Sequence, residues 1–297
     1  LEYDTPVDDI LANGIGRYLV DFLKLYDYEK LQYEASWAIT NIASCGTIQV
    51  QSIVEENCVP YLVDLLKHRN EEIREQAIWA LSNIAGDSDR FRDFILHHNA
   101  LELILEISKT DNLHLLRTTV WAISNLCRGR PSPEWDQVSC SIPYLCRLIY
   151  AKDSEVLEHT CWAFSYLSDI LPQFIDRILE EQVAKKFVEL MYYPDKNIQT
   201  PILRVVGNML TGGDNQTQVL INSSVVPVLK TLIQSSNAKI KKEACWAVSN
   251  ITAGNALQIQ TIIDSGIIPI LHNNIETSSF DVRKECIWAI FNMTVGS

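Results

Sequence analysis

Several signatures that would give this 297-residue chain a chemistry of its own are missing from its sequence. It contains no Gly-rich phosphate loop, no HExxH or GxSxG motif and no Cys/His cluster at metal-ligand spacing, which argues against an enzyme. None of its eight cysteines forms a CxxC pair and most fall in apolar helical stretches, so we expect reduced thiols rather than disulfides or zinc. We therefore predict no cofactor and no metal.

Long apolar runs and a surplus of basic residues are missing as well. No run reaches the roughly 18 residues of a membrane span, and no signal peptide is visible, so we expect an intracellular protein without a membrane partner. The 25 Lys and Arg residues face 37 Asp and Glu residues, which gives a formal charge of −12. An acidic surface repels phosphate backbones and attracts basic ligands, so nucleic acid is not the expected partner.

What the sequence does contain is an internal repeat, which decides the fold. A tryptophan followed four residues later by an asparagine recurs every 42 residues, with one step of 41. In the fourth pair a tyrosine replaces the asparagine, and in the fifth an arginine replaces the tryptophan. We call each pair a rung and the seven together the ladder. The rungs are Trp37 and Asn41, Trp79 and Asn83, Trp121 and Asn125, Trp162 and Tyr166, Arg204 and Asn208, Trp246 and Asn250, and Trp288 and Asn292.

Each repeat is predicted to be helical. In the second repeat, residues 47–57, 59–69 and 70–85 each have the composition of a helix, with Asn70 as the N-cap of the third and Gly86 at its end. Two or three helices per repeat of about 42 residues are typical of a helical solenoid. No strand alternation is visible, so the expected class is all-α.

The longest break in the pattern, residues 128–136, is a Pro-bearing loop rather than a linker between domains. We therefore expect residues 1–297 to form a single domain of about seven repeats. Its first repeat has only part of its early helices, and the sequence stops just after the last asparagine-bearing helix. Because polar end caps are not evident, we expect a piece of a longer array.

The ladder is predicted to face outward. On the helix of residues 70–85, Ile73 and Ala77 belong to an apolar stripe, whereas Gln76, Trp79 and Asn83 share a different one. A buried asparagine without a partner would cost about 1–3 kcal/mol, which a whole ladder would not tolerate. The alternative is that each tryptophan packs between neighbouring repeats and each asparagine makes an internal bond. Outward-facing rungs on stacked helices would line a continuous groove.

Such a groove suits an extended basic peptide. Asparagine amides offer a donor and an acceptor to a peptide backbone, and slots between tryptophans would accept the stems and charges of Lys or Arg. Stacked helices lie about 8–10 Å apart and an extended peptide rises about 3.3 Å per residue, so roughly three peptide residues span one repeat. Carboxylates on or just beyond the third helices set the sign of the ligand: Asp87, Asp169, Asp214, Glu243 and Glu285.

The strings that carry these residues resemble importin-α (karyopherin-α), the armadillo-repeat adaptor for cargo with nuclear localisation signals. They are EASWAITNIAS, IWALSNIAGDS, WAISNLCR, CWAFSYLSD, VVGNMLTGGDNQTQ and KKEACWAVSNITAGN, and they match in order along essentially the whole chain. The resemblance aligns the seven repeats with the family's second to eighth. It implies a right-handed superhelical solenoid of armadillo repeats, a nuclear import adaptor that is not an enzyme, and shuttling between cytoplasm and nucleus.

The resemblance also implies two peptide sites. The major site corresponds to Trp37, Asn41, Gln76, Trp79, Asn83, Asp87, Trp121, Asn125, Trp162 and Tyr166, with Asp87 as the partner of the critical lysine. The minor site corresponds to Arg204, Asn208, Asp214, Thr217, Glu243, Trp246, Asn250, Glu285, Trp288 and Asn292, the pair Arg204 and Asn208 lying between the sites. A signal with two basic clusters could occupy both, and joining them would raise the apparent affinity.

Family members have two further partners. A basic N-terminal segment binds importin-β, and the last repeats contribute to the surface for an export factor. Neither segment is present in this sequence.

Four positions depart from the family pattern. Cys45 and Val50 stand where the family often has Gly and Thr beside the lysine pocket, and Thr118 and His159 replace an Asn and an Asp. These changes weaken the polar lining of the major site, so we expect the minor site to contribute unusually strongly.

Two other interpretations compete with this one. A catenin-type armadillo scaffold would bind acidic partners and need a basic ladder, which the Trp/Asn ladder and the charge of −12 argue against. An enzyme would need a deep pocket for a small substrate.

Overall fold

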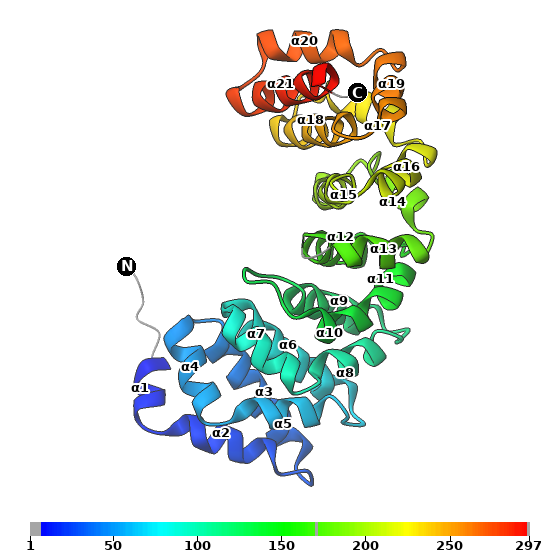
Figure 1. The fold of residues 1–297 in the computed structure, drawn as a ribbon. Helices are drawn as coiled ribbons and strands as arrows, with labels where there is room; N and C mark the ends of the chain where they lie inside the picture. The colour runs from blue at the N-terminus through cyan, green and yellow to red at the C-terminus, as the bar shows by residue number, and fades with distance from the viewer. Residues whose placement is uncertain (1–6, 170–171, 296–297) are drawn as a thin grey trace. The chain divides into compact units, whose positions relative to one another are not determined.

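The computed structural model describes residues 7–169 and 172–295, and Figure 1 labels their helices. These residues form α-helices and one short 3-10 helix, and none of them lies in a β-strand. The all-α prediction is confirmed.

Two compact units, residues 1–144 and 145–297, divide the chain, and we describe each by itself. The prediction of a single domain stays a prediction. The helices of unit 1 are α1 (Val7–Ala12), α2 (Ile15–Leu23) and α3 (Glu29–Ala43); α4 (Thr47–Glu55), α5 (Cys58–Leu65) and α6 (Glu71–Asp87); α7 (Asp89–His97), α8 (Ala100–Ile107) and α9 (Leu113–Leu126); then α10 (Trp135–Val138) and the 3-10 helix η1 (Ser139–Ser141).

The division falls within α11 (Ile142–Leu148). The helices of unit 2 that follow are α12 (Ser154–Ser168); α13 (Pro172–Glu180), α14 (Ala184–Leu190) and α15 (Lys196–Met209); α16 (Asp214–Asn222), α17 (Val225–Leu232) and α18 (Ala238–Thr252); α19 (Ala256–Asp264), α20 (Ile268–Thr277) and α21 (Phe280–Val295). Each complete repeat therefore ends in a long third helix that carries a rung of the ladder.

Local sequence fixes the ends of α6. Asn70 is the N-cap, as predicted, and its Oδ1 accepts a hydrogen bond from the backbone N–H of Glu72 at 2.9 Å. The predicted end at Gly86 is wrong, because α6 continues through Gly86 to Asp87. The extended residue Ser88 stops the helix instead, and its Oγ caps α7 by accepting from the N–H of Phe91.

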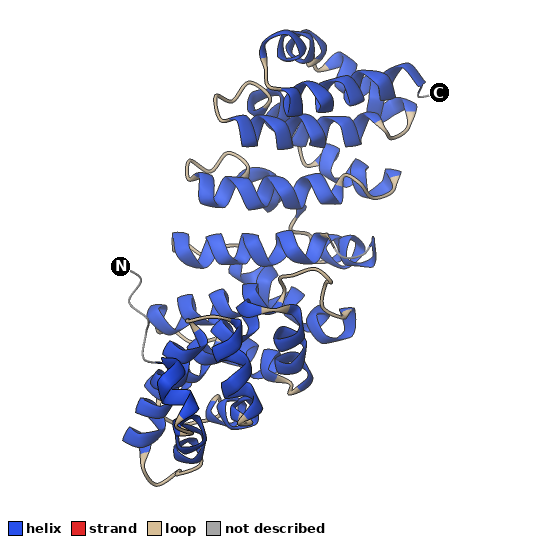
Figure 2. Ribbon diagram, turned by 90° about the vertical axis from the view of Figure 1, so that its left-hand side faces the viewer, coloured by secondary structure: helices blue, strands red, loops and turns tan. Residues whose placement is uncertain are grey.

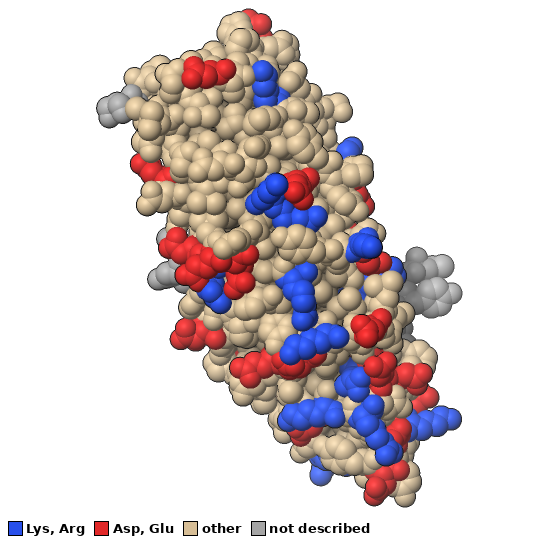
Figure 3. Space-filling model, turned by 90° about the vertical axis from the view of Figure 1, so that its right-hand side faces the viewer, with Lys and Arg blue, Asp and Glu red and all other residues tan. Residues whose placement is uncertain are grey.

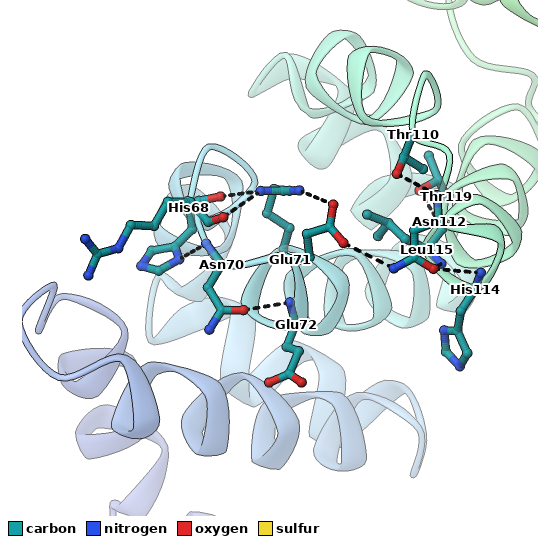
Figure 4. A network of polar contacts seen from close by, with 11 residues as sticks. His68, Asn70, Glu71, Glu72, Thr110, Asn112, His114, Leu115 and Thr119 are labelled. Carbon is teal, nitrogen blue, oxygen red and sulfur yellow. Dashed lines mark hydrogen bonds and ion pairs between the residues drawn. The ribbon is translucent and has the colours of Figure 1, made fainter.

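A polar network ties the start of α6 to the start of α9 (Figure 4). Arg74 donates to the backbone carbonyl of His68 at 2.8 Å and to Glu71 Oε1 at 3.1 Å. Asn112, the N-cap of α9, donates to Glu71 Oε2 at 3.1 Å. These hydrogen bonds join the N-terminal ends of α6 and α9, the third helices of two successive repeats.

Within each unit the third helices pack against one another. In unit 1, α3 contacts α6 and α6 contacts α9; in unit 2, α12, α15, α18 and α21 contact in sequence and lie in parallel layers in Figure 2. The residue two positions after each of the first six ladder positions is buried: Ile39, Leu81, Ile123, Phe164, Val206 and Val248. Two residues are about 200° around a helix of 3.6 residues per turn, so the ladder side chain points away from this core.

All eight cysteines are free thiols, six of them buried. Burial raises the pKa of Cys58, Cys127 and Cys146 to about 12, so these thiols stay protonated. Cys45 is the exposed exception. Among the described residues, no helix combines the length and the apolar composition needed to cross a bilayer.

Candidate functional site

The ladder aromatics reach the surface in both units. Trp37 in unit 1 is 51% exposed and Trp288 in unit 2 is 49% exposed. The other ladder tryptophans are half-buried: Trp79, Trp121, Trp162 and Trp246. Exposed large apolar side chains are candidates for an interaction surface.

Four ladder asparagines are partly exposed and also make an internal hydrogen bond, two roles that were treated as alternatives in the sequence analysis. They are half-buried, and in each case Nδ2 donates to the third helix of the preceding repeat. The acceptors are Thr40 O for Asn83 at 3.1 Å, Ser82 Oγ for Asn125 at 2.9 Å, Gly207 O for Asn250 at 3.1 Å and Ser249 O for Asn292 at 3.0 Å. An internal bond therefore fixes each amide in orientation, while each residue stays partly exposed. Asn41, on the first rung, is exposed.

Asn208 differs from the other asparagines. It is only 6% exposed, and its Nδ2 lies 2.9 Å from Ser168 Oγ and 3.5 Å from Ser165 O. A predicted contact residue for peptide is thus placed inside unit 2, where its amide joins two third helices.

The predicted slot between Trp79 and Trp121 is closed. Their ring centroids are 4.5 Å apart at an interplanar angle of 44°, which is direct contact. Two rings of neighbouring rungs gain more from touching each other than from facing water. A basic side chain bound here would lie along the pair rather than between its members.

The two carboxylate oxygens of Asp87, in unit 1, have different surroundings. Its Oδ1 accepts a hydrogen bond from Thr47 Oγ1 at 2.9 Å, whereas its Oδ2 is buried and has no hydrogen-bond partner among the described residues. A hollow of about 340 Å³ beside it is lined by Asp87 together with Asn83, Trp121, Asn125 and Arg128. A buried polar oxygen without a partner costs about 1–3 kcal/mol, and an ammonium group with three donors would satisfy it.

Arg128, at the edge of this hollow, is not among the predicted site residues. It begins the loop of residues 128–134, and the fully buried Arg92 holds that loop by donating to the carbonyls of Arg128 at 2.7 Å and Pro131 at 2.9 Å. Its place in the sequence could have pointed to the site, because Arg128 begins the loop that follows the third rung, Trp121 and Asn125.

The structure locates the four departures from the family pattern. Cys45 is exposed, whereas Val50 is buried in the core and adds nothing to the surface. Thr118 donates to Glu75 Oε1 at 2.8 Å, so its hydroxyl is engaged within unit 1. His159 is half-buried, and burial lowers its pKa, which favours the neutral ring. The predicted Gln76 is half-buried on α6.

In unit 2, the ladder begins with two aromatic rings on one helix. Trp162 and Tyr166 stack with centroids 5.7 Å apart at 24°. In the next repeat, Arg204 Nη2 lies 2.7 Å from Glu243 Oε1, and its Cζ lies 5.8 Å from the ring centroid of Trp246. The arginine therefore contacts both an acidic and an aromatic member of the predicted minor site.

The other acidic residues of unit 2 differ in exposure. Glu285 is half-buried, and burial raises its pKa from the ordinary value of a glutamate. Asp214 is exposed and accepts a hydrogen bond from Asn255 Nδ2 at 3.1 Å. Thr217 is buried, which leaves it little surface for a ligand.

Charged side chains of both signs gather on another part of the surface. The surface shown in Figure 3, on the side where α14 and α16 lie in Figure 1, carries Lys and Arg residues interspersed with Asp and Glu residues. Mixed charge of this kind is an ordinary solvated surface.

The repeat geometry has a counterpart in a protein family. The model of the armadillo/β-catenin-like repeat matches residues 47–86, 137–169, 213–253 and 255–295, which is half of the chain. The chain belongs to this family. The armadillo prediction is confirmed, and membership of this repeat family supports the prediction that the chain is not an enzyme.

Curated relatives of this armadillo protein are importin-α subunits. It is 43% identical over 248 residues to importin subunit alpha-1b of Oryza sativa subsp. japonica, covering 83% of this chain and 46% of that one. Importin subunit alpha-3 of Arabidopsis thaliana is 41% identical over 83% of this chain and 47% of its own length. The chain thus spans about half the length of these relatives, and the resemblance to importin-α is confirmed.

Solved armadillo structures agree with the fold. An engineered protein matches with a TM-score of 0.92 at 25% identity, over 98% of this chain and 71% of its own. A designed armadillo repeat protein in complex with the peptide (KR)4 matches with a TM-score of 0.54 at 22% identity, over 93% of this chain and 98% of its own.

Proposed function

We propose that this chain is the cargo-binding part of a nuclear import adaptor of the importin-α kind. Its ladder would hold the basic nuclear localisation signal of a cargo protein in an extended conformation. The similarity to importin-α subunits over 83% of the chain supports this proposal. The designed armadillo protein in complex with (KR)4 is a precedent for a Lys/Arg-rich peptide on this fold.

The strongest support for the proposal is the Asp87 hollow in unit 1. One carboxylate oxygen is held by Thr47, and the other is buried without a partner beside the amides of Asn83 and Asn125. A lysine ammonium would supply the missing donor, and its stem would pack on Trp121. Charge-assisted hydrogen bonds of this kind contribute about 1.5–3 kcal/mol.

The amides give the peptide its direction and register. Each internal bond orients the asparagine head, so less rotamer freedom is lost when a peptide backbone binds to it. At about three peptide residues per repeat, the three rungs of unit 1 would contact a short cluster of basic residues.

A second patch in unit 2 would hold further basic residues, through Trp246 with Asn250 and Trp288 with Asn292, and with Glu285 as the anionic partner. The contacts weigh against an unusually strong contribution from this patch, because Glu243 is already paired with Arg204 while Asp87 has an oxygen to spare. We therefore propose unit 1 as the stronger site.

Two further expectations follow from the same proposal. The protein would shuttle between cytoplasm and nucleus. Importin-β and an export factor would bind parts of the longer relatives that this chain does not span.

Peptide titrations test the proposal. A fluorescent peptide of alternating Lys and Arg should bind the full chain, and a peptide of the same length with Glu at those positions should not. Trp121→Ala should weaken the basic peptide about tenfold, since it removes a ring from the Asp87 hollow. Tyr18→Ala, which removes a bulky exposed aromatic outside the ladder, is the control and should change nothing.

Binding of the acidic peptide alone would favour a catenin-type scaffold. Equal binding of both peptides, or equal losses from the two variants, would contradict the proposed groove.

A further inference from the structure

We infer that Arg204 occupies, from within the chain, the place against Trp246 and Glu243 that a basic side chain of a peptide would take. It thereby restrains peptide binding at this rung of unit 2. The inference rests on the proposed function and adds a built-in competitor to it.

The position of Arg204 in the repeat is the first reason. The other six repeats place a tryptophan at this register, and that tryptophan reaches the surface. Arg204 also reaches the surface, with its side chain 48% exposed. It therefore brings a cation to a row that otherwise offers aromatic faces to cations.

Its contacts are those expected of a bound ligand. The guanidinium Nη2 is 2.7 Å from Glu243 Oε1, and Cζ is 5.8 Å from the Trp246 ring centroid. An arginine over a tryptophan gains about 0.5–2 kcal/mol from the ring, and the carboxylate supplies a charge-assisted hydrogen bond. A peptide arginine at this point would have the same two groups as partners.

Because Glu243 is buried, its carboxylate needs the cation that Arg204 supplies. Glu243 is only 8% exposed, so its charge depends on a nearby cation for compensation. Without Arg204 this carboxylate would lose its hydrogen-bonded cation. A Lys or Arg from a peptide could then take over the role.

The ring of Trp246 cannot retreat from Arg204. A Cβ built on Gly207 would lie 2.2 Å from Trp246 Cζ3, so the ring rests directly on the backbone of α15. The backbone of Gly207 thus lies against one side of the Trp246 ring, and the guanidinium of Arg204 lies over the ring. A peptide must displace Arg204 to reach the ring and Glu243 together.

The test measures peptide binding to unit 2 in the full chain carrying Asp87→Lys, which disables the hollow of unit 1. In this background, Arg204→Ala should bind the Lys/Arg peptide about tenfold more tightly than its parent, equivalent to about 1.4 kcal/mol. Arg204→Gln keeps a donor for Glu243 but no charge, and should give a smaller gain if the alanine variant does not fold. The gain should vanish when Trp246→Ala is added, because the two side chains share one contact.

Arg177→Ala is the matched control. It removes one arginine of unit 2 from an exposed pair with Glu180 on α13, away from the ladder. Its effect should stay within about twofold, the level expected of a change in net charge alone.

The outcomes separate the inference from the function. If Arg204→Ala and Arg204→Gln bind no more tightly than the parent while Trp288→Ala weakens binding, the inference is wrong and the groove stands. The inference is equally wrong if Arg177→Ala gives as large a gain as Arg204→Ala. If neither the parent nor the Arg204 variants bind the peptide at all, the proposed function of unit 2 fails and the inference fails with it.

Discussion

Replacing Asp87 by asparagine should weaken peptide binding without weakening the fold. The change keeps the shape of the side chain and a carbonyl oxygen that can accept from Thr47 Oγ1. It removes the negative charge and replaces one acceptor by an amide donor. The buried Oδ2, which has no partner among the described residues, is the atom whose role is tested.

The magnitude follows from this geometry. A charge-assisted hydrogen bond to a lysine ammonium contributes about 1.5–3 kcal/mol, which corresponds to a loss of about tenfold to a hundredfold in affinity. No partner among the described residues loses a bond through Oδ2, so the free energy of unfolding should stay the same within about 1 kcal/mol. If Asp87 served stability instead, the substitution would lower the free energy of unfolding and leave the peptide affinity unchanged.

Fluorescence anisotropy with a Lys/Arg peptide and urea unfolding followed by circular dichroism measure the two quantities. Asp64→Asn is the control, because Asp64 lies on α5 and the change removes one negative charge from its exposed ion pair with Lys67. An unchanged dissociation constant for Asp87→Asn, or a loss no larger than that of Asp64→Asn, would refute the assignment of Asp87.

Three further predictions concern other parts of the chain. Gly207→Ala should force the Trp246 ring off α15, lower the unfolding free energy by about 1–3 kcal/mol and shift tryptophan fluorescence; unchanged values in both would contradict the close approach. Cys45 should be the fast-reacting thiol in Ellman titration of the folded protein, and Cys45→Ser should remove that phase rather than leave it intact. In the Asp87→Lys background, peptide affinity should fall on acidification, and the fall should begin at a higher pH than an unperturbed glutamate would give. Burial raises the pKa of Glu285, and a bound cation favours its ionised form, so Glu285→Gln should abolish this pH dependence.

Periodicity made the fold readable from the sequence. The recurrence of tryptophan and asparagine located every third helix, and Asn70 marked the start of α6 because a cap needs only local backbone. The end of α6 was misplaced by two residues. Gly86 allows a stop but does not require one, and the cap formed by Ser88 decided where the helix ended.

The contacts between rungs could not be read in the same way. Whether Trp79 and Trp121 stand apart or touch depends on side-chain rotamers in three dimensions. Likewise, the repeat pattern predicted that Asn208 contacts a peptide as the other ladder asparagines do. In the structure Asn208 is buried, and its amide donates to the hydroxyl of Ser168. The pairing of Arg204 with Glu243 joins residues 39 apart in the sequence, and no local signal announces it.

Photocrosslinking would show directly where a basic peptide lies on the chain. A Lys/Arg peptide with a photoreactive group at its centre would be crosslinked to the full chain, and the labelled residues would be identified by mass spectrometry. We predict labels on α6 and α9 around the hollow of Asp87, Trp121 and Asn125, competed away by unlabelled basic peptide. Labels confined to the second helices of unit 1, α5 and α8, would contradict a peptide groove along the ladder.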